Sequence, residues 1–167
     1  MKSSKFKSKD KTQYEIIYSN DSKKYKKLID EGLTYLVKNE YLPSKECDLS
    51  DYSEDQHNVL LCKNLSTNNI VGILIFIDEG DMDQTADQEY YTYICFSYVK
   101  PKSRGKGIFS NFIKYLDLYV KEMNLNENIS LYSHINNLEA TVSYVRNGFK
   151  LDKYHEDEEY HHLIRKL

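Results

Sequence analysis

The sequence predicts a mixed α/β fold in which one central sheet of six or seven strands carries helices on both faces. Two observations lead to this prediction. Short segments rich in aromatic and β-branched residues, which favour strands, alternate with longer segments whose apolar residues recur at helical spacing. Their order along the 167 residues is β-α-β-β-β-α-β-α-β-β, and a chain of this length corresponds to a single domain.

The predicted strands are short runs of apolar, aromatic or β-branched residues between turn-forming residues. They comprise, in order, residues 14–18, 59–63, 70–78, 90–99, 129–133, 149–155 and 160–167. The second and third are separated only by the turn-like segment 64–69, so we expect them to form a hairpin. The segments 42–56 and 79–88 are acidic and aperiodic, and we expect them to be loops.

The predicted helices have apolar residues three or four positions apart, which places those residues on one face. They comprise residues 23–39, 107–123 and 138–146. Asn136 or Asn137 is a candidate N-cap of the third helix, because an asparagine side chain can accept a hydrogen bond from a free N–H of the first turn. Gly148 is expected to end the same helix.

The distribution of charge disfavours several classes of protein. Residues 1–11 contain five lysines and one aspartate, so we expect a flexible basic tail there, followed by a single domain over 12–167. Because the whole chain has a net charge of −3 and the tail carries +4, the domain has −7. An acidic domain disfavours nucleic acid as a partner. No apolar run is long enough to span a membrane, and residues 1–11 lack the apolar segment of a secretory signal.

The cysteines and histidines do not predict a metal site. The three cysteines, Cys47, Cys62 and Cys95, are odd in number, include no CxxC pair and match no zinc-binding spacing. The adjacent His161 and His162 would point to opposite faces of a strand. We therefore expect reduced thiols in a cytoplasmic protein that needs no metal.

The segment between strand 90–99 and helix 107–123 is typical of a phosphate-binding turn. It reads VKPKSRGKGIF from Val99 to Phe109. Glycines at positions 105 and 107 would let an anion approach the backbone, and the first N–H groups of the following helix carry partial positive charge. The spacing matches neither the GxxxxGK[ST] loop nor the GxGxxG dinucleotide motif. An ordinary turn before a helix could contain the same residues.

A second pattern lies on the predicted third helix. It reads N-x-x-A-x-x-x-Y-x-x-x-G-F and comprises Asn137, Ala140, Tyr144, Gly148 and Phe149. On a helix its first three residues lie along one face. Because the chain contains sixteen tyrosines, Tyr144 taken alone would more simply be a packing residue.

Together the two patterns resemble the Gcn5-related N-acetyltransferase (GNAT) superfamily, in which V-x-P-x-x-R-G-x-G is followed by the second pattern. The order of the predicted elements also fits a GNAT-like sheet, so the resemblance covers nearly all of the chain beyond the tail. It implies an acetyl-CoA-dependent N-acetyltransferase that acts on a primary amine of a small molecule or protein by direct attack in a ternary complex. Members of this family often dimerise, so the resemblance also allows a homodimer.

The resemblance implies roles for particular residues. The strand end at Tyr98 and Val99 would pair with the pantetheine arm of acetyl-CoA, which Asn137 would also contact. Tyr144 matches the tyrosine that donates a proton to the leaving thiolate. Backbone N–H groups of the turn would bind the pyrophosphate, and they belong to Arg104, Gly105, Lys106, Gly107, Ile108, Phe109 and Ser110.

One residue of the turn departs from the family pattern. Phe109 stands where the family usually has a small residue. Its side chain must therefore point away from the phosphates, towards the core or the adenine.

The general base is not defined by the resemblance. Some family members carry a glutamate midway along the strand that here reads Tyr91-Thr92-Tyr93. The other candidates for this role are Glu89, Glu79, Asp78 and His134, although each of the carboxylates could equally be a solvated loop charge. Glu89 and His134 join Tyr144 in the predicted catalytic set.

Two further functions fit the same residues. The missing glutamate and Phe109 are compatible with a non-catalytic CoA-binding module of the same fold. A toxin-like acetyltransferase that modifies a macromolecule is also compatible, but the acidic domain disfavours RNA as its target. The acidic loops could attract a cationic amine, and solvated loops that keep the protein soluble explain them equally well.

Overall fold

The computed structural model describes residues 3–42, 57–80, 91–125, 127–155 and 159–167. Within them, one mixed sheet has the strand order β1-β2-β3-β4-β5-β6-β8-β7. Its strands are β1 (Ser4–Lys7), β2 (Gln13–Ser19), β3 (Asn58–Asn64), β4 (Ile70–Gly80), β5 (Tyr91–Val99), β6 (Asn128–His134), β7 (Lys150–His155) and β8 (Tyr160–Lys166). The helices are α1 (Lys26–Lys38), α2 (Ile108–Met123) and α3 (Leu138–Arg146), with short 3-10 turns η1 (Lys23–Tyr25) and η2 (Pro101–Ser103). The predicted mixed α/β class is confirmed, with eight strands rather than six or seven.

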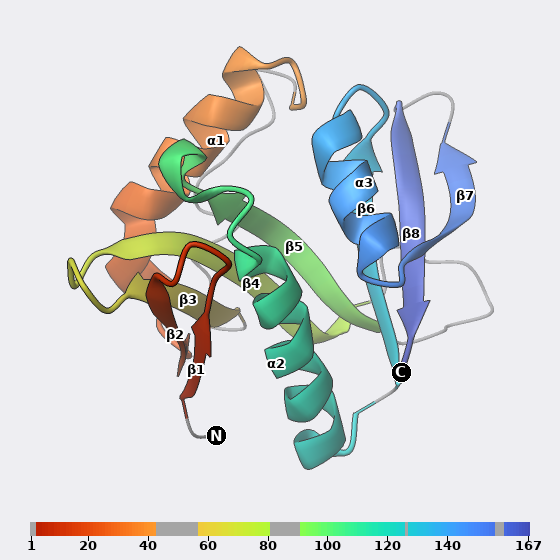
Figure 1. Cartoon of the computed structure of the whole chain (residues 1–167). Coiled ribbons are helices and arrows are strands. Elements are labelled where there is room, and N and C mark those ends of the chain that lie inside the picture. Colours follow the sequence, from red (N-terminus) through yellow and green to blue (C-terminus); the bar gives the residue numbers. More distant parts are fainter. Residues whose placement is uncertain (1–2, 43–56, 81–90, 126, 156–158) are drawn as a thin grey trace.

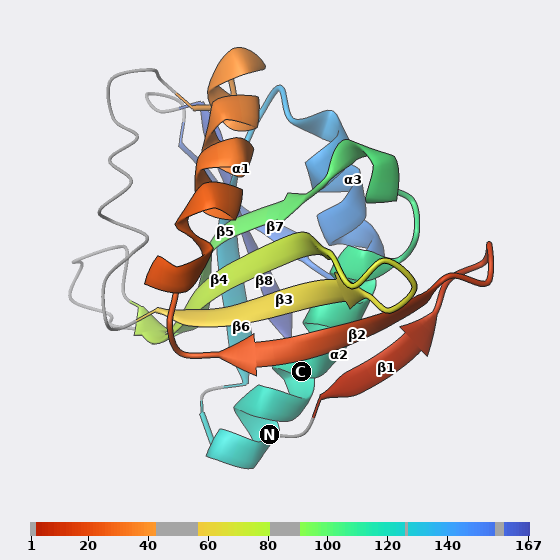
Figure 2. The ribbon, with the colours of Figure 1, turned by 90° about the vertical axis from the view of Figure 1, so that its left-hand side faces the viewer.

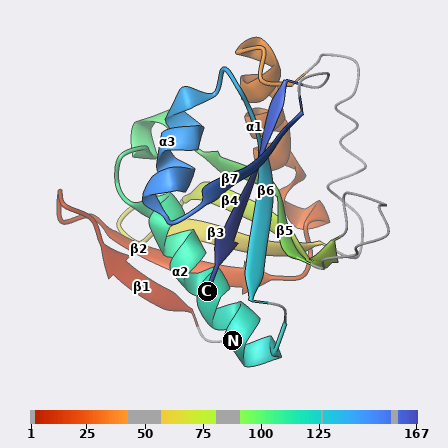
Figure 3. The same cartoon turned by 90° about the vertical axis from the view of Figure 1, so that its right-hand side faces the viewer.

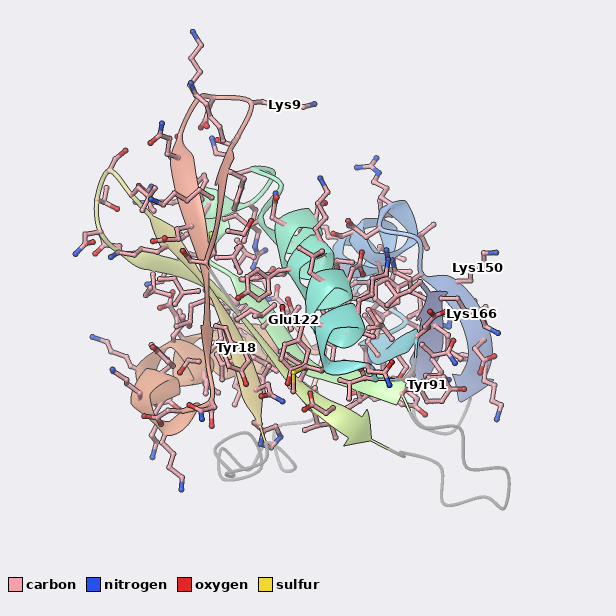
Figure 4. All side chains as sticks on the ribbon, turned by 90° about the horizontal axis from the view of Figure 1, so that it is seen from below. Lys9, Tyr18, Tyr91, Glu122, Lys150 and Lys166 are labelled. Atoms are coloured by element: carbon pink, nitrogen blue, oxygen red, sulfur yellow. The ribbon has the colours of Figure 1, made fainter. Side chains whose placement is uncertain are left out.

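The additional strand lies in the segment that we expected to be a flexible tail. Residues 4–7 form β1 and pair antiparallel with β2 at the edge of the sheet. The Phe6 ring stacks on the Tyr14 ring with centroids 5.3 Å apart, so the basic segment buries its one aromatic side chain. Lys9, at the tip of the hairpin, extends away from the rest of the molecule (Figure 4). A strand with a single apolar residue shows no alternation of apolar and polar residues, so the sequence pattern did not predict β1.

The two faces of the sheet carry separate hydrophobic cores. On one face, α1 packs through Leu28, Ile29 and Leu33 onto alternate residues of β3 and β4. On the opposite face, α2 packs through Phe112 and other apolar residues. The helix α3 lies on the same side as α2, over β6 and β8 (Figure 3). The predicted arrangement of helices on both faces is therefore confirmed.

The sheet opens between its two central strands. β5 and β6 are the only parallel neighbours in the described sheet, and they pair only where Thr92–Ile94 meets Ile129–Leu131. Beyond these residues the two strands lean apart, β5 towards α1 and β6 beneath α3 (Figure 1). The carboxyl ends of two neighbouring strands therefore form the sides of an opening in the sheet.

A β-bulge in β5 contributes to this opening. Ile75 of β4 pairs with Phe96, whereas the next residue, Phe76, pairs with Ile94, so Cys95 is an extra residue in β5. Residues two apart normally share a face, but here Ile94 packs in the core beneath α2 and Phe96 in the core beneath α1. Because a bulge increases local twist, it turns the end of β5 away from β6.

Candidate active site

The opening between β5 and β6 contains a cavity of about 870 Å³. This volume lies within the range of small-molecule binding sites. Its walls include most of the residues that the sequence predicts for the site, namely Tyr98, Val99, Arg104, Gly105, Gly107, Ile108, Phe109, Ser110, His134, Asn137 and Tyr144. Lys106 is not part of the lining, and Glu89 lies outside the described residues. The two motifs, separated in sequence, therefore meet around one space.

The glycine turn has the geometry of an anion site. Gly105 and Gly107 have φ angles of +71° and +78°, in the left-handed region that favours glycine. A Cβ atom on Gly105 would meet nothing within 4 Å, so the turn is open to a ligand on that side. The helix α2 begins at Ile108, and Gly107 before it provides no side-chain cap. The N–H groups of the first turn of α2 thus lack helical acceptors, as at helix ends that bind phosphate.

The Arg104 side chain braces the turn. Its Nε donates to the Val99 carbonyl at 3.1 Å, and one terminal nitrogen donates to the Tyr35 hydroxyl at 2.7 Å. The guanidinium carbon lies 4.2 Å from the centroid of the Tyr35 ring. The Arg104 backbone N–H donates to the Pro101 carbonyl at 3.2 Å. This N–H, which we expected to bind pyrophosphate, is therefore used within the turn itself.

The Lys106 side chain is also held by the protein. Its ammonium forms an ion pair with Asp10, in the turn between β1 and β2. This ion pair and the hydrogen bond from Ser8 hold the pKa of Asp10 far below its usual range. The turns at the ends of β1, β3 and β5 lie at the same end of the sheet, which brings residue 10 close to residue 106 (Figure 2). The N-terminal hairpin thus contacts the turn that lines the cavity.

Tyr144 projects from α3 into an aromatic environment beside the cavity. Its ring lies edge-on to the Phe109 ring, with centroids 5.2 Å apart, and 6.0 Å from the Phe149 ring. Burial raises the pKa of Tyr144 to about 12. Phe109 packs against Tyr144 and the core beneath α2, in line with the expectation that its side chain points away from the phosphates. The phenol therefore stays protonated at neutral pH in the wall of the cavity.

Asn137 fixes the start of α3. Its side-chain oxygen accepts a hydrogen bond from the Ala140 N–H at 3.3 Å, and its own N–H donates to the His134 carbonyl at 2.9 Å. It is thus the predicted N-cap, and the predicted helix 138–146 is confirmed. Because Asn137 also lines the cavity, its side-chain amide nitrogen is the group left for a ligand.

His134 is the last residue of β6 and also lines the cavity. The Asn136 N–H donates to its Nδ1 at 3.2 Å, so the neutral ring carries its proton on Nε2. Nε2 lies 3.6 Å from a carboxylate oxygen of Glu159. With Nδ1 used by the backbone and Nε2 protonated, the neutral imidazole has no lone pair left for a substrate proton.

Among the described residues, none of the carboxylates proposed as bases lines this cavity. Asp78 accepts hydrogen bonds from the Tyr119 hydroxyl and the Asn58 side-chain amide, each at 3.0 Å, and is not part of the lining. Its contacts are those of a structural residue between β3, β4 and α2. Glu89 lies outside the described residues, as does the side chain of Glu79.

Several lining residues were not predicted from the sequence. Tyr35, Tyr41, Tyr132 and Tyr160 all face the cavity. Since tyrosines are frequent throughout this chain, no pattern distinguished these four. Cys95, at the bulge, also lines the cavity as a free thiol whose pKa is raised to about 12 by burial.

The described residues offer neither a metal-binding cluster nor a helix that could span a membrane. No three histidine, cysteine, aspartate or glutamate side chains in the described part of the chain are placed to share a metal ion. None of the helices described in the structure has the length and apolarity to cross a membrane.

Comparison with known proteins identifies the class to which this fold and cavity belong. The family model described as "Acetyltransferase (GNAT) family" matches residues 25–149. That match spans most of the chain, from η1 to the end of the second motif. The protein therefore belongs to the GNAT acetyltransferase family, and the resemblance seen in the sequence is confirmed.

Solved structures of GNAT proteins share the fold at low sequence identity. The GNAT domain of PAT from S. lividans has a TM-score of 0.72 at 11% identity, over 99% of this chain and 97% of that one. A GNAT acetyltransferase from Staphylococcus aureus has a TM-score of 0.67 at 20% identity, over 91% and 99%. A candidate streptothricin acetyltransferase from Bacillus anthracis, solved with acetyl coenzyme A, has a TM-score of 0.56 at 18% identity, over 75% and 72%. No curated protein sequence matches the chain.

Proposed function

We propose that the protein transfers an acetyl group from acetyl-CoA to a primary amine by direct attack within a ternary complex. The observation that carries this proposal is the single cavity that joins the glycine turn to Tyr144 through the opening between β5 and β6. A ligand with a diphosphate at the turn would extend towards the bulge at Cys95. An amine could then enter from the side of His134.

The residues present fit the phosphate and pantetheine parts of acetyl-CoA. Backbone N–H groups of Gly105, Lys106 and Gly107 and those of the first turn of α2 are the proposed donors to the pyrophosphate. Beyond Ile94 no described strand pairs with the β6-facing edge of β5, and this edge is the proposed partner of the amides of the pantetheine arm. The Val99 carbonyl is the exception, because Arg104 already occupies it.

The chemistry assigned to Tyr144 is protonation of the leaving sulfur. When bound, acetyl-CoA supplies the acetyl group as a thioester. The neutral amine nitrogen bonds to the carbonyl carbon and gives up one proton to water, the C–S bond breaks, and the sulfur takes a proton from the Tyr144 hydroxyl. The products are an N-acetyl amine and the free thiol, and the phenolate regains its proton from water.

In this cavity the Tyr144 phenolate and the released thiolate should have similar affinities for a proton. A phenol with a pKa of about 12 would be a weak donor to a thiolate in water. Burial acts on thiols in the same direction, and it raises the pKa of the Cys95 thiol in the same cavity to about 12. A thiolate released beside Tyr144 would therefore bind a proton about as strongly as the phenolate does.

We further propose that the amine loses its proton to water before it attacks. Neutralising a lysine-like amine at pH 7 costs about 4.6 kcal/mol. Glu139 is the one carboxylate among the described lining residues, and it lies 3.9 Å from the Arg104 guanidinium. We expect kcat/KM to rise with pH towards the pKa of the acceptor amine. Because Tyr144 loses its proton only as the pH rises through about 12, we expect no alkaline fall up to pH ~10.

The pH dependence is measured from initial rates of thiol release at saturating acetyl-CoA, with amines of different pKa as acceptors. The rising limb should move with the pKa of the amine. A limb that stays near pH 6.5 for every amine would instead indicate a histidine base and contradict this proposal.

Titration calorimetry with acetyl-CoA and CoA tests the function itself. We expect both to bind, and acetyl-CoA to be consumed in the presence of an amine panel. Absence of binding at millimolar concentration would refute the assignment. Tight binding without transfer to any amine, peptide or aminoacyl-tRNA would favour the non-catalytic module of the same fold.

A further inference from the structure

A cluster of aromatic residues forms one part of the cavity wall. His134 of β6 lies between Tyr41, which follows α1, and Tyr160 of β8, and all three line the cavity. The His134 ring is 6.2 Å from the Tyr41 ring and 5.3 Å from the Tyr160 ring, which stands perpendicular to it. The Tyr160 hydroxyl donates to the Tyr41 carbonyl at 3.3 Å. We call these three residues the aromatic subsite.

A carboxylate is held beside the aromatic subsite. The Glu159 side chain approaches His134 Nε2 to 3.6 Å and remains largely exposed. Its backbone has a φ of +56°, in the left-handed region, and its carbonyl accepts a hydrogen bond from the Ile135 N–H at 3.0 Å. A non-glycine residue adopts this conformation at a cost, and such costs are frequent at functional sites. The backbone of Glu159 is thus held against the loop that follows β6.

Glu159 places a negative charge next to the aromatic subsite, although it is not itself part of the cavity lining. His134 is neutral when Nδ1 accepts from the Asn136 N–H and Nε2 carries the ring proton. The two tyrosines are uncharged at neutral pH, so Glu159 supplies the charge. The lining itself also carries Arg104, Arg146 and Glu139, and Arg104 lies 3.9 Å from a carboxylate oxygen of Glu139.

We propose that the acceptor is a small amine with a second cationic group, and that this group binds against the aromatic subsite beside Glu159. The proposal rests on the proposed function, which places the reacting amine at the opening between β5 and β6. The faces of tyrosine rings attract ammonium groups, and a nearby carboxylate strengthens the attraction. An anionic acceptor would meet Glu159 with like charge and is disfavoured.

Binding of matched amines to the full-length protein saturated with CoA tests this proposal. The probes are diaminoalkanes of three to six carbons and the alkylamines of the same length, measured by titration calorimetry. We expect one diamine to bind about tenfold more tightly than its matched monoamine, as one desolvated cation–aromatic contact would give. The preference should shrink as salt is added, because added ions screen Glu159. For amines that are acetylated, kcat/KM should show the same preference.

Glu159→Gln removes the charge and keeps the shape of the side chain. We expect it to reduce the preference for the diamine to about twofold, with the affinity for CoA unchanged. Tyr41→Leu removes one ring without altering the Glu159 turn and should also reduce the preference. Glu122→Gln removes an exposed charge on α2, away from the cavity (Figure 4). This variant should keep the full preference for the diamine.

The outcomes separate this inference from the proposed function. Failure of CoA to bind would refute the function. If CoA binds but each diamine and its monoamine bind equally, or neither binds, the inference is wrong while the CoA site stands. A preference that persists in Glu159→Gln and in Tyr41→Leu would also overturn it.

Discussion

Replacing Tyr144 by phenylalanine should lower kcat about a hundredfold and leave the affinity for acetyl-CoA almost unchanged. The substitution removes only the hydroxyl, and no hydrogen bond from that hydroxyl is found among the described residues. The ring contacts with Phe109 and Phe149 persist in the variant, so the wall of the cavity should keep its shape. Steady-state kinetics and titration calorimetry measure the two quantities separately.

A second tyrosine provides the matched control for this variant. Tyr119 is buried on α2, and its hydroxyl donates to Asp78 away from the cavity. Tyr119→Phe should lower the free energy of unfolding by about 1 kcal/mol or more, because Asp78 loses a partner, while kcat stays unchanged. If Tyr144→Phe instead lowers stability and affinity as much as kcat, Tyr144 is a packing residue and the sulfur is protonated by another group.

The sequence predicted α3 to the residue because both ends carry local signals. Asn137 supplies the cap, and Gly148, with a φ of +88°, supplies the left-handed residue after the helix. The glycine turn was predictable for the same reason, since Gly105 and Gly107 act through their own backbone conformations. Features that depend on one residue and its near neighbours can therefore be predicted from the sequence.

Features that depend on distant partners were not predictable in this way. The Arg104 N–H was expected to face a ligand, but it donates to Pro101 within the turn, a choice that depends on η2 forming there. The bulge at Cys95 appears only when β5 is aligned with β4. Such contacts follow from the register and packing of whole elements, which a single sequence does not encode position by position.

The aromatic subsite shows the same limit most clearly. Tyr41, His134 and Tyr160 come from three elements far apart in the chain, and they meet only because β6 and β8 pair beside the end of α1. Each is one aromatic residue among many. His134 was predicted by its place after a strand at the opening, but the tautomer of its neutral ring follows from the hydrogen bond that Nδ1 accepts from the Asn136 N–H.

Replacing Gly107 by alanine should weaken the binding of acetyl-CoA at least tenfold. A φ of +78° is costly for alanine, and its Cβ would stand where a phosphate approaches the first turn of α2. Loss of one hydrogen bond to a charged oxygen accounts for about 1.5–3 kcal/mol. Titration calorimetry with CoA measures the effect.

Gly148→Ala places the same residue at a similarly left-handed position, with φ +88°, at the end of α3. Its Cβ would lie 3.4 Å from Nε of Arg165, which already donates to the Asn147 carbonyl and binds Asp117. This control should therefore lower the thermal midpoint at least as much as Gly107→Ala does, yet keep the affinity for CoA. Equal affinities in the two variants would mean that the free N–H groups at the start of α2 do not hold the pyrophosphate, because backbone strain alone would then explain both substitutions.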